Sequence, residues 1–378
     1  MHLLSSFPHY GLSFLILITV LVFVHELGHF LVARWCGVGV EVFSIGFGPE
    51  LFGYTDKAGT RWRFSALPLG GYVRMFGSPD LGLEGGAPGV AETEADRARS
   101  FMNKSPLARI AISAAGPLAN FLFAFLVLGV LYTTAGKVYS APVIGEVVAG
   151  SAADRAGLKP GDTILSIDGH SIDRFEDLAA SVQLNLAKPL VLHISRQSTT
   201  SDVTVVPDIT EQTDLFGNVQ RVGRLGVRSV GGGKVVRLDP GAAVVAAARE
   251  VYETSVNILV GIRQIITGSR SSEEVGGILR IAKLSGDVAN LGIVSLIGLA
   301  ALFSVNLGLL NLFPIPILDG GQIVYYLVEF VRGRPLTPRA QEWGLRLGLA
   351  ALVGLMLFAT WNDLVYLKVI AYIKALFT

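Results

Sequence analysis

The chain has 378 residues, 51% hydrophobic and only 16% charged, against about 25% charged in soluble domains, so its composition indicates a membrane protein. Its 31 basic and 30 acidic residues nearly cancel, which argues against a nucleic-acid-binding surface and against a polybasic lipid-binding tail. The single cysteine, Cys36, can form neither a disulfide within the chain nor a cysteine-based zinc finger.

Four apolar runs are long enough to cross a hydrocarbon core about 30 Å thick at 1.5 Å per residue. They cover about residues 11–35, 107–135, 293–313 and 345–373. The first run exceeds the apolar stretch of a signal peptide, lacks a basic start and contains His25, Glu26 and His29, so we interpret it as a retained transmembrane helix. Four spans would place both termini on one side of the membrane.

Basic residues flank two of the connecting loops, and cytoplasmic loops are enriched in Lys and Arg. The flanking residues are Arg34, Lys104 and Arg109 between the first two spans, and Arg332, Arg334 and Arg339 between the last two. These loops are therefore predicted to be cytoplasmic, and the long segment of about 141–290 to lie outside. Lys368 and Lys374, near the end of the fourth span, weaken this assignment.

Two segments follow the first span. Residues 42–76 alternate short apolar runs with glycines, a pattern that predicts strands and tight turns in a small sheet at the membrane face. Residues 78–100 are rich in Gly, Ala, Glu and Asp without apolar periodicity, and we predict a mobile loop there.

The segment after the second span has the pattern of a small soluble α/β module, with strands at VIGEVV, LVLHIS and DVTVV and a helix at FEDLAASVQ. It resembles a PDZ domain through Ser151–Gly157 and the following run of Leu158, Gly161, Asp162, Ile164, Ile167, Asp168 and Gly169. A PDZ groove receives an extended peptide as an added strand. The alternative is that the module only excludes bulky substrates, and both roles stay open.

The remaining boundaries complete the predicted organisation. We expect a first transmembrane helix over 1–36, a cytoplasmic-side β element and loop over 37–105, a second span over 106–136, a PDZ-like module over 141–210, a linker with helices on the membrane surface over 211–290, and the last two spans over 291–378. The fold class is thus a mainly α-helical membrane protein with four transmembrane helices, a membrane-associated β element and one extracytoplasmic PDZ-like α/β module.

The motif HELGH at residues 25–29 carries the chemistry. On a helix, His25 and His29 lie one turn apart on one face, so both imidazoles can bind one metal ion with Glu26 beside its open side. Zinc lowers the pKa of a bound water toward about 7, and a glutamate can take its proton and return it to the leaving amine. Ionisable groups at membrane depth cost on the order of 3 kcal/mol each, and a bound metal would compensate for three of them within five residues.

A catalytic zinc takes three protein ligands, and the third must come from elsewhere in the chain. The other histidines, His2, His9, His170 and His193, are poor candidates by location. Asp319 is better, because Pro314 and Pro316 interrupt the third span just before it, and interrupted helices at membrane depth line buried or wet sites. Its alternative role is to cap the helix that follows.

Asn311 precedes these prolines at the end of the third span. It could pack between helices or donate a hydrogen bond to a substrate backbone, and we favour the second role.

HELGH in the first span, the PDZ-like module and NLFPIPILDGG in the third span together resemble the site-2 protease family of intramembrane zinc metalloproteases, in its bacterial regulator-of-sigma-E branch. The resemblance implies His25, His29 and Asp319 as zinc ligands and Glu26 as general base that activates the zinc-bound water. It also implies substrate contacts, made by Asn311, Pro314 and Pro316 and by Gly70 and Gly71 of a β element that pairs with substrate.

Two features depart from that family. Well-known members of the branch carry two PDZ modules, and this sequence shows one. The segment GGILRIAKLSG has Gly277 where the family usually has proline.

The leading hypothesis is therefore an intramembrane zinc endopeptidase in the bacterial inner membrane, with its PDZ-like module in the periplasm. Its substrate would be a single-span membrane protein, as in regulated intramembrane proteolysis of anti-sigma factors, and its other partner membrane lipid. The alternative is a non-catalytic membrane scaffold that binds peptides through the PDZ-like groove. A metal transporter would need acidic or histidine residues repeated through several spans. Only Asp319 and the HELGH cluster fit that pattern, so we rank this function last. The sequence names neither the substrate nor the oligomeric state.

Overall fold

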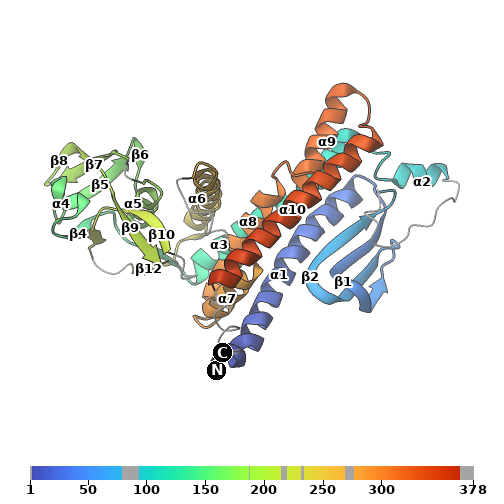
Figure 1. The fold of residues 1–378 in the computed structure, drawn as a ribbon, viewed down its shortest axis with the longest axis horizontal. Coiled ribbons are helices and arrows are strands. Elements are labelled where there is room, and N and C mark those ends of the chain that lie inside the picture. The colour runs from blue at the N-terminus through green and yellow to red at the C-terminus, as the bar shows by residue number, and fades with distance from the viewer. Residues whose placement is uncertain are drawn as a thin grey trace. The chain divides into compact units, whose positions relative to one another are not determined.

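The computed structural model describes residues 2–78, 93–186, 188–213, 219–230, 234–268 and 276–366. The chain separates into two compact units (Figure 1). The first unit comprises Met1–Leu128, Ala248–Ser255 and Ile278–Thr360, and the second comprises Gly129–Ala247, Val256–Gly277 and Trp361–Thr378.

Within the described ranges, four helices are long and apolar enough to cross a membrane. They are α1 (His2–Trp35), α3 (Pro106–Thr134), α8 (Ile293–Asn311) and α10 (Pro338–Tyr366). Each coincides with one of the predicted apolar runs, although α10 begins earlier than expected and the end of its run, after residue 366, lies outside the described residues. Many of their leucines and valines are exposed, as expected for helices whose outer faces contact lipid.

Small residues let α1, α3 and α8 approach closely in the first unit. A Cβ on Gly28 of α1 would stand 2.3 Å from the carbonyl oxygen of Ala115 on α3, and one on Gly308 of α8 would stand 2.9 Å from that of Pro117. The buried Ser304 hydroxyl of α8 donates to the Asn120 carbonyl of α3 at 2.8 Å. Van der Waals contact and such buried hydrogen bonds hold helices together where the hydrophobic effect between them is weak.

The predicted strands after the first span are present as β1 (Val40–Thr55) and β2 (Arg61–Met75). Both strands bend, so that residues 42–45 of β1 pair with 61–64 of β2 and also with 71–74. Phe43, on this doubly paired segment, stacks on Trp62 and meets the edge of Phe30 from α1. Figure 1 shows the resulting curved β element beside α1.

The predicted loop over 78–100 contains a short helix at its end, α2 (Glu94–Arg99). Thr93 accepts a hydrogen bond from the Asp96 backbone, and the Asp96 side chain accepts one in return from the Thr93 backbone. This capping box favours a helix in a segment without apolar periodicity, so the loop prediction was wrong for these residues. Residues 79–92 of the predicted loop lie outside the described part of the chain.

Two further helices of the first unit are α7 (Ile278–Ala289) and α9 (Asp319–Arg332). α7 packs along α1, where Gly286 meets the ring of Tyr10. As predicted, α8 ends before Pro314 and Pro316, and a new helix starts at Asp319. The N-cap of α9 is Leu318, not Asp319.

The second unit contains the PDZ-like module. Its four-stranded sheet has the order β6-β5-β7-β8, and β4 pairs with β11. The strands are β4 (Ile144–Val147), β5 (Thr163–Ile167), β6 (His170–Ser171), β7 (Leu190–Arg196), β8 (Thr199–Val205) and β11 (Val227–Ser229), and the helices are α4 (Ala152–Arg155) and α5 (Phe175–Gln183). The core contains Ile164, Leu178 and Leu192 and also Leu225, so the module includes residues beyond 210, where we expected a linker.

Further strands belong to the second unit, and one long helix after them has residues in both units. β9 (Asp208–Thr213) and β10 (Val219–Arg224) form a hairpin. β3 (Lys137–Tyr139) enters the module and pairs with β12 (Lys234–Val236), which leaves it. The long helix α6 (Pro240–Ile266) begins after an Asp239 cap, and Asp239 accepts from the backbone of Gly241 and Ala242.

Candidate metal centre

Two histidines and one aspartate converge in the first unit. His25 and His29 follow one another by one turn of α1, and Asp319 is the first residue of α9. The Asp319 carboxylate places Oδ2 3.1 Å from His25 Nε2 and Oδ1 3.4 Å from His29 Nε2. The two Nε2 atoms are 3.3 Å apart. Both imidazoles are buried.

These separations fit a metal ion. A tetrahedral zinc with bonds of about 2.0–2.1 Å holds its ligand atoms about 3.3 Å from one another. The separation of 3.3 Å between the two Nε2 atoms matches that value, and each imidazole has one Asp319 oxygen near it, Oδ2 at 3.1 Å and Oδ1 at 3.4 Å. Two imidazoles and one carboxylate are also a ligand set of catalytic zinc sites. His25, His29 and Asp319 form a metal-binding group in the described part of the chain.

Helix α3 fixes the orientation of both imidazoles. His29 Nδ1 lies 2.8 Å from the Ile112 carbonyl oxygen, to which it donates, so its Nε2 is free to bind a metal. His25 Nδ1 lies 3.1 Å from the side-chain nitrogen of Asn120, whose Oδ1 is buried without a partner among the described residues. Amide oxygen and nitrogen are assigned from such partners. With the amide turned, its oxygen would accept from a proton on His25 Nδ1 and leave His25 Nε2 free to bind a metal.

Gly116 of α3 provides the space that the ligands need. A Cβ at this position would lie 2.3 Å from His29 Nε2 and 2.8 Å from His25 Cε1. Any larger residue would therefore enter the space in which the ligand nitrogens meet.

Glu26 is a residue of α1, and its side chain meets the β element. The backbone of Val73 in β2 hydrogen-bonds to its carboxylate, and a Cβ on Gly71 would stand 3.5 Å from its Cγ. The carboxylate also interacts electrostatically with His25, His29 and Asp319. A carboxylate beside the ligands and not among them is placed to exchange protons there.

Over the ranges it describes, the structure records no contact between the other predicted site residues and the three candidate ligands. Gly70 has φ of +144°, and its Cβ would stand 2.4 Å from the Phe47 ring, so this bend of β2 requires glycine. Asn311 is the last residue of α8 and is partly buried. Pro314 is exposed and Pro316 partly buried. Their role toward a substrate stays a prediction.

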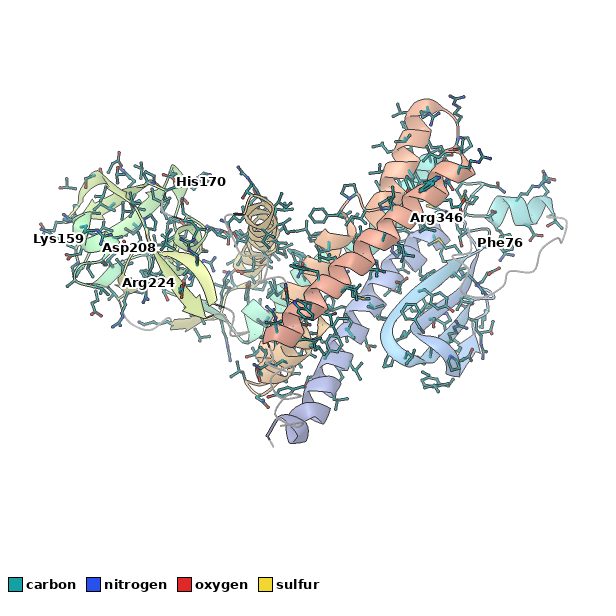
Figure 2. The ribbon with its side chains drawn as sticks, viewed as in Figure 1. Phe76, Lys159, His170, Asp208, Arg224 and Arg346 are labelled. Carbon is teal, nitrogen blue, oxygen red and sulfur yellow. The ribbon has the colours of Figure 1, made fainter. Side chains whose placement is uncertain are left out.

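The two histidines of the PDZ-like module, His170 and His193, are not part of this metal-binding group. His170 is exposed on β6 of the PDZ-like module (Figure 2), and His193 of β7 pairs with Asp202 at 2.6 Å. His2 and His9 lie within the first turns of α1.

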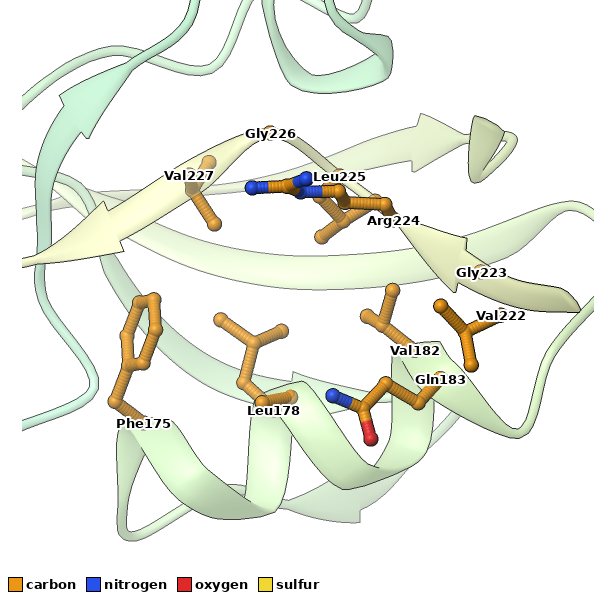
Figure 3. Close-up of a pocket in the computed structure, with 11 residues that line it drawn as sticks. Phe175, Leu178, Val182, Gln183, Val222, Gly223, Arg224, Leu225, Gly226 and Val227 are labelled. Atoms are coloured by element: carbon orange, nitrogen blue, oxygen red, sulfur yellow. The ribbon is translucent and has the colours of Figure 1, made fainter. Parts of the chain in front are cut away.

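The PDZ-like module has a groove of its own. It encloses a cavity of about 360 Å³ between α5 and the strand segment 222–227 (Figure 3). Leu178 and Val182 of α5 face it from one side, and Arg224 and Leu225 from the other. In the same module, the buried Asp162 carboxylate accepts two hydrogen bonds of 2.6 Å from Arg196.

Sequence reasoning missed three groups that build the site, namely Ile112, Gly116 and Asn120 of α3. Asn120 offered a signal, because an amide inside an apolar span is a functional candidate. Gly116 and the Ile112 carbonyl offered none, since neither differs from its apolar surroundings in the sequence.

Comparison with known proteins gives a consistent result. The model of peptidase family M50 matches residues 13–355. A protein of Agrobacterium fabrum named as a zinc metalloprotease is 42% identical over 359 residues, which are 94% of this chain and 95% of that protein. The metalloprotease MmpA of Caulobacter vibrioides is 39% identical over 390 residues, 97% of this chain and 98% of its own. Among solved structures, the PDZ domain of an SdrC-like protein of Listeria monocytogenes aligns with 25% of this chain and 92% of its own at 15% identity and a TM-score of 0.20.

Proposed function

The chain belongs to peptidase family M50, the site-2 protease family, and on that premise we propose that it cuts a single-span membrane protein within or at the edge of the bilayer. Membership makes the chain a multi-pass membrane zinc metalloprotease, which favours an enzyme over the non-catalytic scaffold. The observation that carries the proposal is the convergence of His25, His29 and Asp319 beside Glu26, on helices whose outer faces are apolar.

The residues have distinct roles in this proposal. His25, His29 and Asp319 hold the zinc, which when bound polarises a carbonyl and acidifies a water. The Glu26 carboxylate accepts the proton of the attacking water and delivers it to the nitrogen of the leaving amine. Ile112 and Asn120 hold the imidazoles in the tautomer that leaves each Nε2 free.

The β element supplies a place for the substrate. A helical substrate must unwind before its peptide bond can be cut, and its freed backbone groups then need partners in a place poor in water. β2 passes beside Glu26 at Gly71 and Val73, so a substrate strand along this part of β2 would bring its peptide bonds toward the catalytic carboxylate. Gly70 and Gly71 would contact the substrate on this side, and Asn311, Pro314 and Pro316 on the other.

We also propose how the chain is arranged in the membrane. All four apolar helices cross the bacterial inner membrane, the basic loops are cytoplasmic and the PDZ-like module is periplasmic. The substrate would be of the anti-sigma type, cut after another protease has removed its outer domain. The support for this part is the distribution of basic residues together with the family resemblance.

The test is cleavage of a single-span substrate by the purified full chain, with bound zinc quantified. Glu26→Gln should retain zinc and lose cleavage by about 10²- to 10⁴-fold, the contribution of a general base. Glu342→Gln is the matched control, because Glu342 is an exposed residue of α10 that pairs with Arg346. Full activity of Glu26→Gln, or a wild-type chain that holds no zinc, would refute the proposal.

A further inference from the structure

A buried ion pair joins α3 to α9. Arg109 Nη2 donates to Glu329 Oε1 at 2.5 Å, and the two side chains are only 4% and 15% exposed. The guanidinium carbon also lies 4.7 Å from the ring centroid of Tyr326, one turn earlier on α9. Desolvation makes a buried ion pair a poor source of net stability.

Arg109 lies on the same face of α3 as the groups that orient the two histidines. Arg109, Ile112, Gly116 and Asn120 are spaced by three, four and four residues, which places them in one row along the helix. The Ile112 carbonyl binds His29, Gly116 lies under both imidazoles and Asn120 meets His25. One face of α3 therefore touches α1 at the ligands and α9 at Glu329.

On α9, the ion pair shares a face with the third ligand. Asp319, Tyr326 and Glu329 are spaced by seven and three residues, again one row. Ten residues of helix separate Asp319 from Glu329, about 15 Å at 1.5 Å per residue. The helix is stiff over this length, so a shift of α9 at Glu329 would carry the Asp319 carboxylate away from the imidazole nitrogens that it now meets at 3.1 and 3.4 Å.

We propose that Arg109 is a positioning residue for the metal centre. Arg109 binds Glu329 and covers Tyr326, and these contacts fix how far α9 lies along its own axis relative to α3. The Asp319 carboxylate at the start of α9 is thereby held opposite the two imidazoles of α1. The proposal rests on the proposed zinc site, but it does not depend on which substrate is cut.

The experiment measures metal binding by the purified full chain in detergent, with Co²⁺ as the probe. Three variants remove the pair in different ways: Arg109→Met, Glu329→Gln and the double Arg109→Met/Glu329→Met. Co²⁺ affinity is measured by chelator competition, and the visible absorption of bound Co²⁺ reports the ligand geometry. The melting temperature is recorded for each variant.

Each single variant should bind Co²⁺ at least about tenfold more weakly, the lower end of the range for outer partners of metal ligands, with an altered visible spectrum. The double variant leaves no unpaired buried charge, so its melting temperature should return close to that of the wild type. Its Co²⁺ affinity should stay reduced, because α9 is no longer fixed to Arg109. This separation of stability from metal binding is what a merely structural role would not produce.

Arg346→Met is the matched control. Arg346 of α10 (Figure 2) also pairs with a glutamate at 2.5 Å and lies 5.9 Å from an aromatic ring, that of Trp343, but its pair with Glu342 is exposed and lies within one helix. The control should bind Co²⁺ as the wild type does.

Three results would overturn the proposal or its premise. Wild-type affinity and spectrum in folded single variants would overturn the positioning role. So would a double variant that recovers both stability and Co²⁺ affinity, which would make the pair merely structural. A wild-type chain that binds no Co²⁺ would overturn the metal site together with this role, whereas normal Co²⁺ binding without proteolysis would count only against the proposed function.

Discussion

The metal centre and the groove of the PDZ-like module are assembled from different parts of the chain. The metal centre joins residues 25, 29 and 319, and a third helix orients them through residues 112 and 120. The groove is lined by residues of α5 and of the segment 222–227, within one small module. The first site depends on a few directed polar contacts between helices, and the second on apolar surface supplied by one helix and one strand.

The two sites should therefore respond differently to the loss of a single contact. Loss of one polar contact in the metal centre leaves a ligand misplaced or a buried polar group unpaired. The groove has several apolar side chains of similar kind, so the loss of one changes its shape only partly. Perturbations of one region should therefore leave the other intact, and four experiments test that separation.

Metal removal should have the largest effect. A zinc chelator should abolish cleavage, and added Zn²⁺ should restore it, because the chain's own residues cannot replace the charge of the metal. Hydrogen exchange of β5 and β7 in the full chain should not change on chelation, since the PDZ-like module holds none of the three ligands. Cleavage that persists once zinc is shown to be gone would contradict the metal-dependent mechanism.

Gly116→Ala should come next. The added methyl group would lie 2.3 Å from His29 Nε2, so the imidazoles must move apart and zinc affinity should fall by about 10- to 100-fold. Chelator competition measures the affinity. Gly129→Ala on the same helix is the matched control, because its Cβ would meet no atom within 4 Å. Equal affinities of the two variants would show that the space at Gly116 is not needed.

Asp162→Asn tests the PDZ-like module and should spare the metal centre. Burial alone would raise the pKa of the Asp162 carboxyl, but hydrogen bonds from Arg196 and from the Lys159 backbone outweigh burial and hold this pKa below its ordinary value. Loss of these charge-assisted hydrogen bonds should lower the free energy of unfolding of the module by about 1–3 kcal/mol. Zinc affinity should not change.

The same carboxyl gives a pH dependence of known sign. Because its pKa is lower in the folded state, its stabilisation is complete above the unfolded pKa of about 3.9 and disappears as the pH falls through the folded pKa. Hydrogen exchange of β5 and β7 at pH 7 and near pH 3 measures this in the full chain. The difference between wild type and variant should be present at pH 7 and shrink at acid pH, and an equal difference at both would contradict the assignment.

Ala179→Trp should have the smallest effect and decides the role of the groove. Ala179 lines the groove, so an indole there would displace a peptide bound as an added strand. We expect cleavage of a full-length single-span substrate to slow by about fivefold, equivalent to about 1 kcal/mol of binding. Val191→Trp, at an exposed position of β7, is the control. Unchanged cleavage would contradict peptide binding and favour a module that only excludes bulky substrates.

Much of the fold followed from local patterns. Length and apolarity predicted the four long helices, and alternation with glycines predicted β1 and β2. The prediction over 78–100 was wrong for α2, because a capping box starts a helix there without an apolar stripe. The predicted end of the PDZ-like module at residue 210 followed from the last strand pattern, at DVTVV, whereas Leu225 completes the core through contacts that no local pattern indicates.

From the sequence alone, His25, His29 and Asp319 could be named as candidate ligands of the metal centre. Helical periodicity places His25 and His29 on one face, and an aspartate after two prolines in an apolar span has few other uses. The groups that hold these residues in place became visible in the tertiary structure. They are the Ile112 carbonyl, the space at Gly116 and the Asn120 amide, together with the pair of Arg109 and Glu329 in the proposed positioning role. The physical reason is that these contacts join segments far apart in the chain, and their geometry depends on how helices pack, which leaves no periodic pattern in either segment.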